Sequence, residues 1–302
     1  MSNLLILGGS GFLSGTLARA ALERGQHVWA LTRGQRPLPH GVIGLIADRR
    51  DPARFAATLA GAGIHWDLVV DCIAFAPQDI QQDLAVLESL ARQLVFISTD
   101  FVYEPTRRRF PQGEETQHYT STGYGAQKRL CELELQKSTN GAMAWTIVRP
   151  CHIYGPGSQL GCLPAHGRDA QLIARLQAGE PLRLVGGGHF LQQPVLAEDL
   201  ARVILDLGGQ TAAFSQTFCV AGPEFVESSE YYRIIAELLG AELRIEELPI
   251  AAYLAEHPQA AAFLCHRIYD LTRLWEAGIA PPATPLADGL RKHVASLTAD
   301  AQ

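Results

Sequence analysis

Tyr124 and Lys128 stand four residues apart in the segment Tyr124-Gly125-Ala126-Gln127-Lys128, a spacing that places a phenol and an amine on one face of a helix. Ser98, Thr99 and Asp100 follow an apolar stretch upstream and add two hydroxyls and a carboxyl. A free tyrosine has a pKa of about 10, and a neighbouring ammonium favours the phenolate, which allows proton exchange near neutral pH. We therefore expect Tyr124 to act as general acid/base, Lys128 to lower its pKa, Thr99 with Ser98 to orient a substrate oxygen, and Asp100 to assist as an acid.

Such a proton-transfer site needs a redox partner, and the start of the chain predicts one. Leu4–Leu7 is a short apolar stretch followed by Gly8-Gly9-Ser10-Gly11-Phe12-Leu13, the pattern of a buried strand, a tight glycine turn and a helix start. Glycines let the backbone approach a pyrophosphate, which then lies at the positive end of the helix dipole. This segment predicts a dinucleotide-binding loop, and a bound nicotinamide would make hydride transfer the partner of the tyrosine's proton transfer.

The first half of the chain alternates short apolar strands with amphipathic helices, which predicts an α/β fold with a doubly wound parallel sheet of the Rossmann type. The expected strands are Leu4–Leu7, Val28–Leu31, Val42–Ile46, Leu68–Cys72, Leu94–Ser98 and Trp145–Val148, and the expected helices are Phe12–Arg24, Pro52–Ala60, Ile80–Ala91 and Ala126–Gln136. In a parallel sheet, ligands bind at the carboxyl ends of the strands, where Thr99 falls.

The alternation of strands and helices changes near residue 150. We therefore expect a nucleotide-binding domain over 1–150 and a smaller mixed α/β substrate lobe over 151–302. The boundary is approximate and the chain is interleaved between the two. The elements expected in that lobe are helices at Arg168–Ala178, Glu198–Leu207, Ser229–Leu239 and Pro285–Val294 and strands at Leu182–Val185, Thr217–Val220 and Glu242–Glu246.

Together these motifs resemble the extended short-chain dehydrogenase/reductases, in the NAD(P)-dependent epimerase/dehydratase group, over nearly the whole chain. The resemblance implies that Gly8 to Leu13 form the nucleotide loop and that Lys128 also holds the cofactor's ribose. Ser14 replaces the third glycine of the pattern and is small enough to be tolerated. The remaining residues that the resemblance places at the cofactor are Asp48 with Arg49 near the adenine, Ala74, Phe75 and Ala76 along the dinucleotide, and Pro150 and His152 in the segment joining the lobes.

The end of the second strand bears on which dinucleotide is used. Ala30-Leu31-Thr32-Arg33-Gly34 carries an arginine where an NAD enzyme usually carries an acidic residue, and Arg36 follows closely. Because a carboxylate would repel the extra phosphate of NADP whereas an arginine would bind it, we expect NADP(H), with Arg33 as the main phosphate contact and NAD as the alternative.

Several positions limit which reaction and substrate the chain can have. Family dehydratases carry Glu after Thr-Asp, where this chain has Phe101, which argues against dehydration. Many nucleotide-sugar enzymes carry Asn at the position of His152 and Arg near Gln192 to bind the diphosphate, and this chain has neither. Arg175 and Arg267 are candidate substitutes. The segment Ser98-Thr99-Asp100-Phe101-Val102 also resembles dehydrorhamnose-type sugar reductases.

We therefore expect an NADP-dependent reductase or epimerase acting on the carbonyl or secondary alcohol of a sugar-like substrate or nucleotide sugar. The alternative is a non-catalytic cofactor-sensing or RNA-binding protein, because the chain also resembles a branch that includes chloroplast stem-loop RNA-binding proteins. Retention of Tyr124 and Lys128 favours an enzyme, and the net charge of −6 disfavours RNA.

Composition limits the class of protein to which the chain can belong. The 302 residues are 47% hydrophobic and 19% charged, which is typical of a globular protein with a large core. The sequence shows neither a secretory signal nor a membrane span, and its six cysteines are scattered, so we expect a cytoplasmic protein with reduced thiols and no membrane partner. Cys162 and His166 lack the further ligands of a metal site. The family resemblance also implies pairing through two long helices, here Ile80–Ala91 and Gly125–Lys137, so a homodimer is the default expectation.

Overall fold

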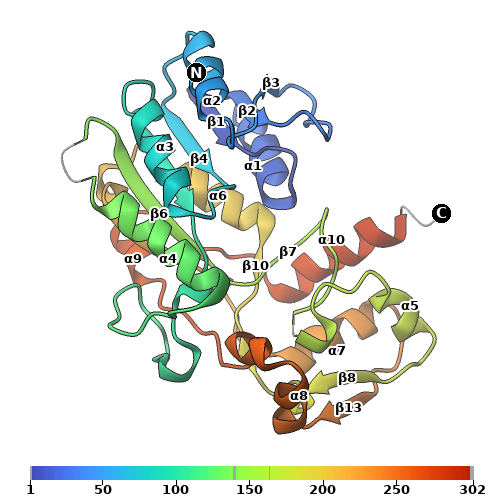
Figure 1. Ribbon diagram of the computed structural model, residues 1–302. Coiled ribbons are helices and arrows are strands. Elements are labelled where there is room, and N and C mark those ends of the chain that lie inside the picture. The colour runs from blue at the N-terminus through green and yellow to red at the C-terminus, as the bar shows by residue number, and fades with distance from the viewer. Residues whose placement is uncertain (1, 139–140, 163, 300–302) are drawn as a thin grey trace.

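A parallel sheet of seven strands forms the centre of the computed structural model, which describes residues 2–138, 141–162 and 164–299. The strands are short, apolar and mostly buried, as expected for a sheet covered on both faces (Figure 1). Across the sheet they run in the order β11 (Gln216–Val220), β6 (Ala144–Pro150), β5 (Gln93–Ile97), β4 (Leu68–Asp71), β1 (Asn3–Leu7), β2 (His27–Thr32) and β3 (Ile43–Ile46).

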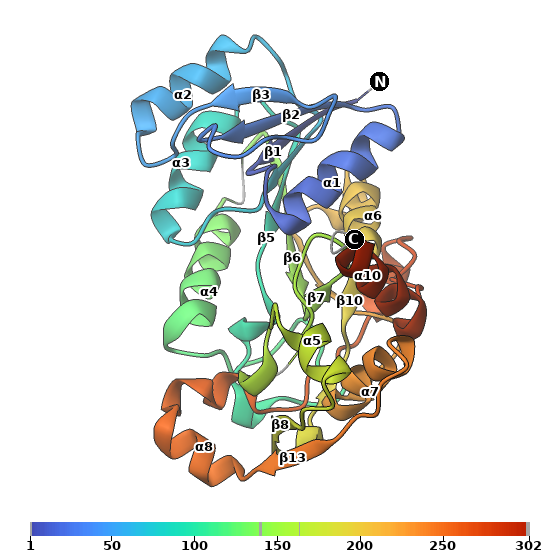
Figure 2. The same ribbon diagram turned by 90° about the vertical axis from the view of Figure 1, so that its right-hand side faces the viewer.

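Helices cover both faces of this sheet, and Figure 2 shows the two helical layers on either side of it. One face carries α1 (Phe12–Glu23) and α6 (Ala197–Leu207), and the other carries α2 (Pro52–Gly61), α3 (Pro77–Leu87) and α4 (Gly123–Gln136). The side chains of β1 alternate between the two layers, since Leu4 and Ile6 join one apolar core while Leu5 and Leu7 join the other.

The C-terminal lobe has a core of its own, which includes Tyr154, Leu176, Ile235 and Leu290. Its helices are α5 (Leu172–Gln177), α7 (Ser228–Leu238), α8 (Ile250–Glu256) and α10 (Leu286–Ala299), whereas α9 (Thr272–Glu276) packs through Leu274 on the core between the main sheet and α1 and α6. Its short strands form three pairs, β7 (Ile153–Tyr154) with β10 (Val195–Leu196), β9 (Leu191–Gln192) with β12 (Val226–Glu227), and β8 (Leu182–Val185) with β13 (Ile245–Leu248).

The predicted doubly wound α/β fold is confirmed, and three local predictions need correction. The strand expected in the second lobe at Thr217–Val220 is β11, which pairs with β6 in the main sheet. The helix expected at Ile80–Ala91 starts earlier because Pro77 occupies its first turn and Asp79 caps it, and it ends at Leu87. The helix expected from Arg168 starts only at Leu172, since Arg168 adopts a positive φ. The division at residue 150 stays a prediction.

Candidate active site

The glycine loop between β1 and α1 borders a cavity of about 610 Å³. Gly8 and Gly9 adopt positive φ angles, and a Cβ on Gly9 would overlap the side chain of Ala30 on the neighbouring strand. The buried Ser14 hydroxyl accepts a hydrogen bond from the Gly11 N–H at 3.1 Å, so this residue closes the turn in place of a third glycine. The first-turn amides of α1, which starts at Phe12, have no acceptor within the helix and point toward an incoming anion. The loop therefore fits the pyrophosphate of a dinucleotide.

Arginines gather at the far end of this cavity, where β2 and β3 end. Arg33 and Arg36 are exposed along its wall, and no described carboxylate forms an ion pair with either. Asp48 accepts hydrogen bonds from Arg50, which lower its pKa to about 2. An ionised Asp48 neutralised by Arg50 leaves Arg33 and Arg36 available to an anionic ligand.

Arg49 lines the same cavity, and its guanidinium is engaged by protein groups, so its expected contact with the cofactor stays a prediction. Its guanidinium nitrogens donate to the carboxylates of Asp71 at 3.1 Å and Asp83 at 2.9 Å and to the Asp79 carbonyl at 3.0 Å. The side chain is largely buried. Arg49 thus ties the end of β4 to α3, a structural role that its position beside Asp48 does not reveal.

The segment after β4 joins the glycine-loop cavity to a second one. Phe75 lines both cavities, as do Cys72 and Ile97, so the two form one cleft. The backbone N–H groups of Phe75 and Ala76 donate to Asp79 Oδ2 at 2.8 and 3.0 Å, which fixes the path of this segment. The Ala74 carbonyl turns toward α4.

The second cavity, of about 580 Å³, contains the predicted catalytic residues Thr99, Tyr124 and Lys128 in its wall. Lys128 is only 2% exposed, and its Nζ donates to the Ala74 carbonyl at 2.8 Å above the ring of Phe96. Burial lowers the pKa of this amine, while the Asp71 carboxylate opposes the shift. Pro150 and His152 line the same cavity from the strand segment that leads into the second lobe.

A glycine brings helix α4 close to the strand end that carries Thr99. A Cβ on Gly125 would overlap the carbonyl oxygen of Phe101, so only glycine permits this approach. Thr122 stands at the start of the helix, although its side chain makes no capping hydrogen bond. The close approach places Tyr124 beside Thr99.

The pKa of Tyr124 is shifted in the direction opposite to the expected one. Burial raises the pKa of its phenol, the charge of Asp100 acts in the same direction, and the hydrogen bond with Thr99 opposes them. Lys128 was expected to lower this pKa, but its amine is directed at Ala74. At neutral pH the phenol is therefore protonated, the form required of a proton donor.

Ser98 also lines the cavity, but its hydroxyl is engaged by a buried carboxylate. Its hydroxyl donates to Glu132 at 2.6 Å, and Glu132 also accepts from Arg149 at 2.7 and 2.8 Å. All three residues are buried. Ser98 therefore fixes α4 against the end of β5, and Thr99 is the hydroxyl left to orient a substrate.

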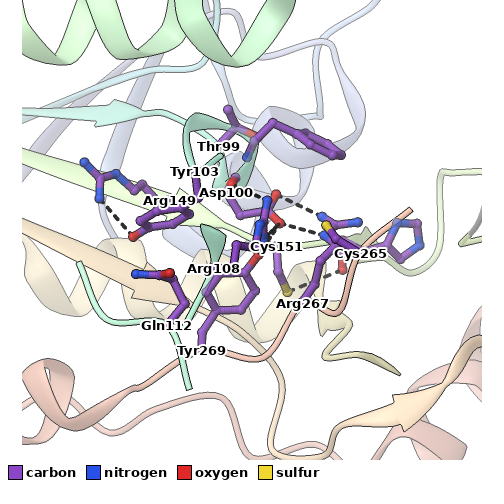
Figure 3. A network of polar contacts seen from close by, with 12 residues as sticks. Thr99, Asp100, Tyr103, Arg108, Gln112, Arg149, Cys151, Cys265, Arg267 and Tyr269 are labelled. Atoms are coloured by element: carbon purple, nitrogen blue, oxygen red, sulfur yellow. Dashed lines mark hydrogen bonds and ion pairs between the residues drawn. The ribbon is translucent and has the colours of Figure 1, made fainter. Parts of the chain in front are cut away.

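Asp100 lies at the centre of a buried polar network that joins the two lobes (Figure 3). Arg267 donates to both of its carboxylate oxygens, at 2.7 and 2.9 Å, and the Tyr269 hydroxyl donates to one of them. Arg108 completes the cluster with an ion pair at 3.6 Å. The charge of Arg267 holds the pKa of Asp100 below its usual value, so the group carries no proton at neutral pH. This contradicts the prediction that Asp100 assists as an acid.

Neither arginine considered as a diphosphate ligand is free. Arg267 lines the cavity but is occupied by Asp100, and Arg175 forms ion pairs with Asp169 and Glu180 in the second lobe. No local pattern signals the pairing of Asp100 with Arg267 or that of Glu132 with Arg149, because the partners are far apart in sequence.

Residues 4–213 match the model of the NAD dependent epimerase/dehydratase family. The chain belongs to this family. It is therefore an enzyme of the NAD(P)-dependent epimerase and oxidoreductase type, and the residues of the glycine loop fit the expected dinucleotide. The predicted resemblance is confirmed at this level.

Two curated relatives and one solved structure illustrate the range of this similarity. A dTDP-4-dehydro-6-deoxy-D-allose reductase of Streptomyces bikiniensis is 26% identical over 96% of this chain and 94% of its own. The chloroplast stem-loop binding protein of 41 kDa b of Arabidopsis thaliana is 26% identical over 74% of this chain, and the match spans 59% of that protein. The UDP-glucose 4-epimerase of Thermotoga maritima, crystallised with UDP-glucose, superposes with a TM-score of 0.79 at 19% identity, covering 99% of this chain and 100% of that one.

Two searches among the described residues found nothing. No group of three or more His, Cys, Asp or Glu side chains is arranged to hold a metal ion. No helix in the described ranges is both long and apolar enough to cross a membrane.

Proposed function

We propose that the protein is an NADP(H)-dependent reductase that converts a carbonyl of a small molecule to a secondary alcohol. The observation that carries the proposal is the presence of Thr99, Tyr124 and Lys128 in the wall of a cavity that continues into the glycine-loop cavity. Bound NADPH would supply the hydride.

Three side chains of the cavity have separate roles in this reaction. Tyr124 delivers a proton to the substrate oxygen, and its raised pKa keeps the phenol in the donor form, which favours the reductive direction. The Thr99 hydroxyl, hydrogen-bonded with Tyr124, orients that oxygen. Lys128 uses one N–H on the Ala74 carbonyl and retains two others for the cofactor's ribose hydroxyls.

The preference for NADP(H) rests on Arg33 and Arg36. Both are exposed at the adenosine end of the cavity without a described carboxylate partner. A charge-assisted hydrogen bond to phosphate contributes about 1.5–3 kcal/mol, so we expect NADPH to bind at least about tenfold more tightly than NADH. Fluorescence titration of both cofactors tests this, and tighter binding of NADH would reject the assignment.

The reductases among the relatives support a carbonyl substrate, and the dTDP-4-dehydro-6-deoxy-D-allose reductase among them supports the sugar-like prediction. The similarity to UDP-glucose 4-epimerase makes epimerisation the second candidate. Mass spectrometry of small molecules released from the purified protein separates the two, because an epimerase recycles its cofactor in place and retains the oxidised form. An exchanging NADPH supports the reductase.

The experiment that tests the proposal compares Tyr124→Phe with the native protein in NADPH-dependent ketone reduction. We expect turnover to fall by about 10²–10⁴-fold, the usual contribution of a general acid, with little change in NADPH affinity. Unchanged turnover would remove Tyr124 from the mechanism. Tight, salt-sensitive binding of stem-loop RNA in a filter assay would instead support the RNA-binding alternative. A homodimer through α3 and α4 and a cytoplasmic location remain predictions, which size-exclusion chromatography and cell fractionation check.

A further inference from the structure

The cavity beside Tyr124 is walled mainly by apolar side chains. We propose that the substrate is a ketone bearing an alkyl or aryl group, rather than a sugar attached to a nucleoside diphosphate. This inference rests on the proposed reductase function and specifies its substrate class.

Four aromatic rings form the main wall, in the order Phe75, Tyr124, Phe101 and Phe263. Successive ring centroids are 6.2, 6.5 and 4.8 Å apart, within the range of favourable aromatic contact. All four side chains line the cavity. The wall begins at the catalytic phenol and ends in the second lobe, so an apolar group attached to the reacting carbonyl can lie along it.

Two of these rings are unusually exposed for apolar residues. Phe75 is 53% exposed and Phe263 is 42% exposed, and both line the cavity. Exposed apolar surface concentrated in a concave site is typical of a ligand-binding surface. Ile153 and Ala260 add further apolar surface to the same cavity.

The cations of the cavity do not suit a diphosphate. Arg267 is 4% exposed and donates to both oxygens of Asp100. Lys128 is buried and directed at Ala74. Arg168 donates to the Ile153 carbonyl and lies 5.8 Å above the ring of Phe12, on the side of the cofactor loop.

His152 offers no further charge. Its ring is half-buried, and desolvation lowers its pKa to about 3, so the imidazole is neutral at neutral pH. A diphosphate carries two negative charges and is normally held by more than one available cation. Among the described arginines that line this cavity, only Arg168 lacks a carboxylate partner.

Reduction of a series of methyl ketones from butanone to octanone, with benzylacetone, tests the inference. Burial of one CH₂ contributes about 0.8 kcal/mol, so kcat/KM should rise about fourfold per added CH₂ until the wall is covered. In Phe263→Ala this increase should be lost and KM for benzylacetone should rise about tenfold, with unchanged kcat and NADPH affinity. Phe263→Leu should recover most of the loss. The matched control is Phe225→Ala, which removes another exposed ring that does not line the cavity.

A binding experiment separates the inference on substrate class from the proposed reductase function. The NADP⁺-saturated protein is titrated with the alcohol of benzylacetone and with UDP-glucose, and we expect the alcohol to bind at least tenfold more tightly. Equal or tighter binding of UDP-glucose, no binding of the alcohol, or a flat alkanone series overturns the inference and leaves the reductase proposal standing if Tyr124→Phe abolishes turnover. Ketone reduction that Tyr124→Phe does not affect removes the reductase proposal itself.

Discussion

The buried pairing of Asp100 with Arg267 predicts a large loss of stability in Asp100→Asn. The substitution keeps the shape of the side chain but removes the charge that compensates Arg267 and Arg108, both of them buried. Breaking a buried ion pair by neutralising one partner costs about 3–5 kcal/mol of unfolding free energy. With a urea m-value of about 3 kcal/mol/M, the unfolding midpoint should fall by about 1–1.7 M.

Urea unfolding monitored by tryptophan fluorescence measures this shift, and Asp288→Asn is the matched control. Asp288 forms an exposed ion pair with Arg291 on α10, and its loss should cost less than about 1 kcal/mol. If the two variants unfold at the same urea concentration, the network does not stabilise the junction of the lobes and the reasoning is refuted.

The pH dependence of the same difference provides a second check. Because the pKa of Asp100 is lower in the folded protein than in the unfolded chain, its charge stabilises the native state above the unfolded value of about 3.9. The difference between native protein and Asp100→Asn should persist from pH 7 down to about pH 4 and shrink as the pH falls further. A difference that grows on acidification would contradict the assigned direction.

Three further predictions follow from single contacts. Gly125→Ala forces a methyl group into the Phe101 carbonyl, so kcat should fall at least about 10²-fold in the ketone assay, whereas Gly61→Ala, which has open space at the Cβ position, should not change it. Arg33→Gln should weaken NADPH binding about 10–100-fold and NADH binding less than about twofold, and parallel losses for both cofactors in titration would exclude a phosphate contact. Since the raised pKa of Tyr124 keeps its phenol protonated, ketone reduction should persist up to pH 10 and decline above it. A pH–rate profile whose alkaline decline begins below pH 9 would contradict this.

The sequence was sufficient where function depends on local spacing. Gly8 to Leu13 require a particular backbone path whatever surrounds them, and Tyr124 and Lys128 share a helix face by periodicity alone. These features predicted the β1–α1 loop and the residues that line the second cavity. They did not predict the direction of the Tyr124 pKa shift, because burial depends on residues from both lobes.

Other features depend on contacts between distant segments. Asp100 looks like a free acid next to Thr99 until Arg267, 167 positions away, folds against it. Arg49 looks like an unpaired cation beside Asp48 until α3 brings Asp83 against it. The strand β11 reads as part of the second lobe because the chain returns to the main sheet only after a long excursion. Such ion pairs and pairings have no local sequence pattern, so they become visible only in three dimensions.

The most direct test of the catalytic arrangement is a single-turnover experiment with benzylacetone and NADPH carrying deuterium at both C4 positions of the nicotinamide. The account predicts that one deuterium appears on the carbinol carbon of the alcohol in the native protein, and that Tyr124→Phe slows this transfer at least about 10²-fold while still binding NADPH. An unlabelled alcohol, or transfer at the native rate in Tyr124→Phe, would contradict it.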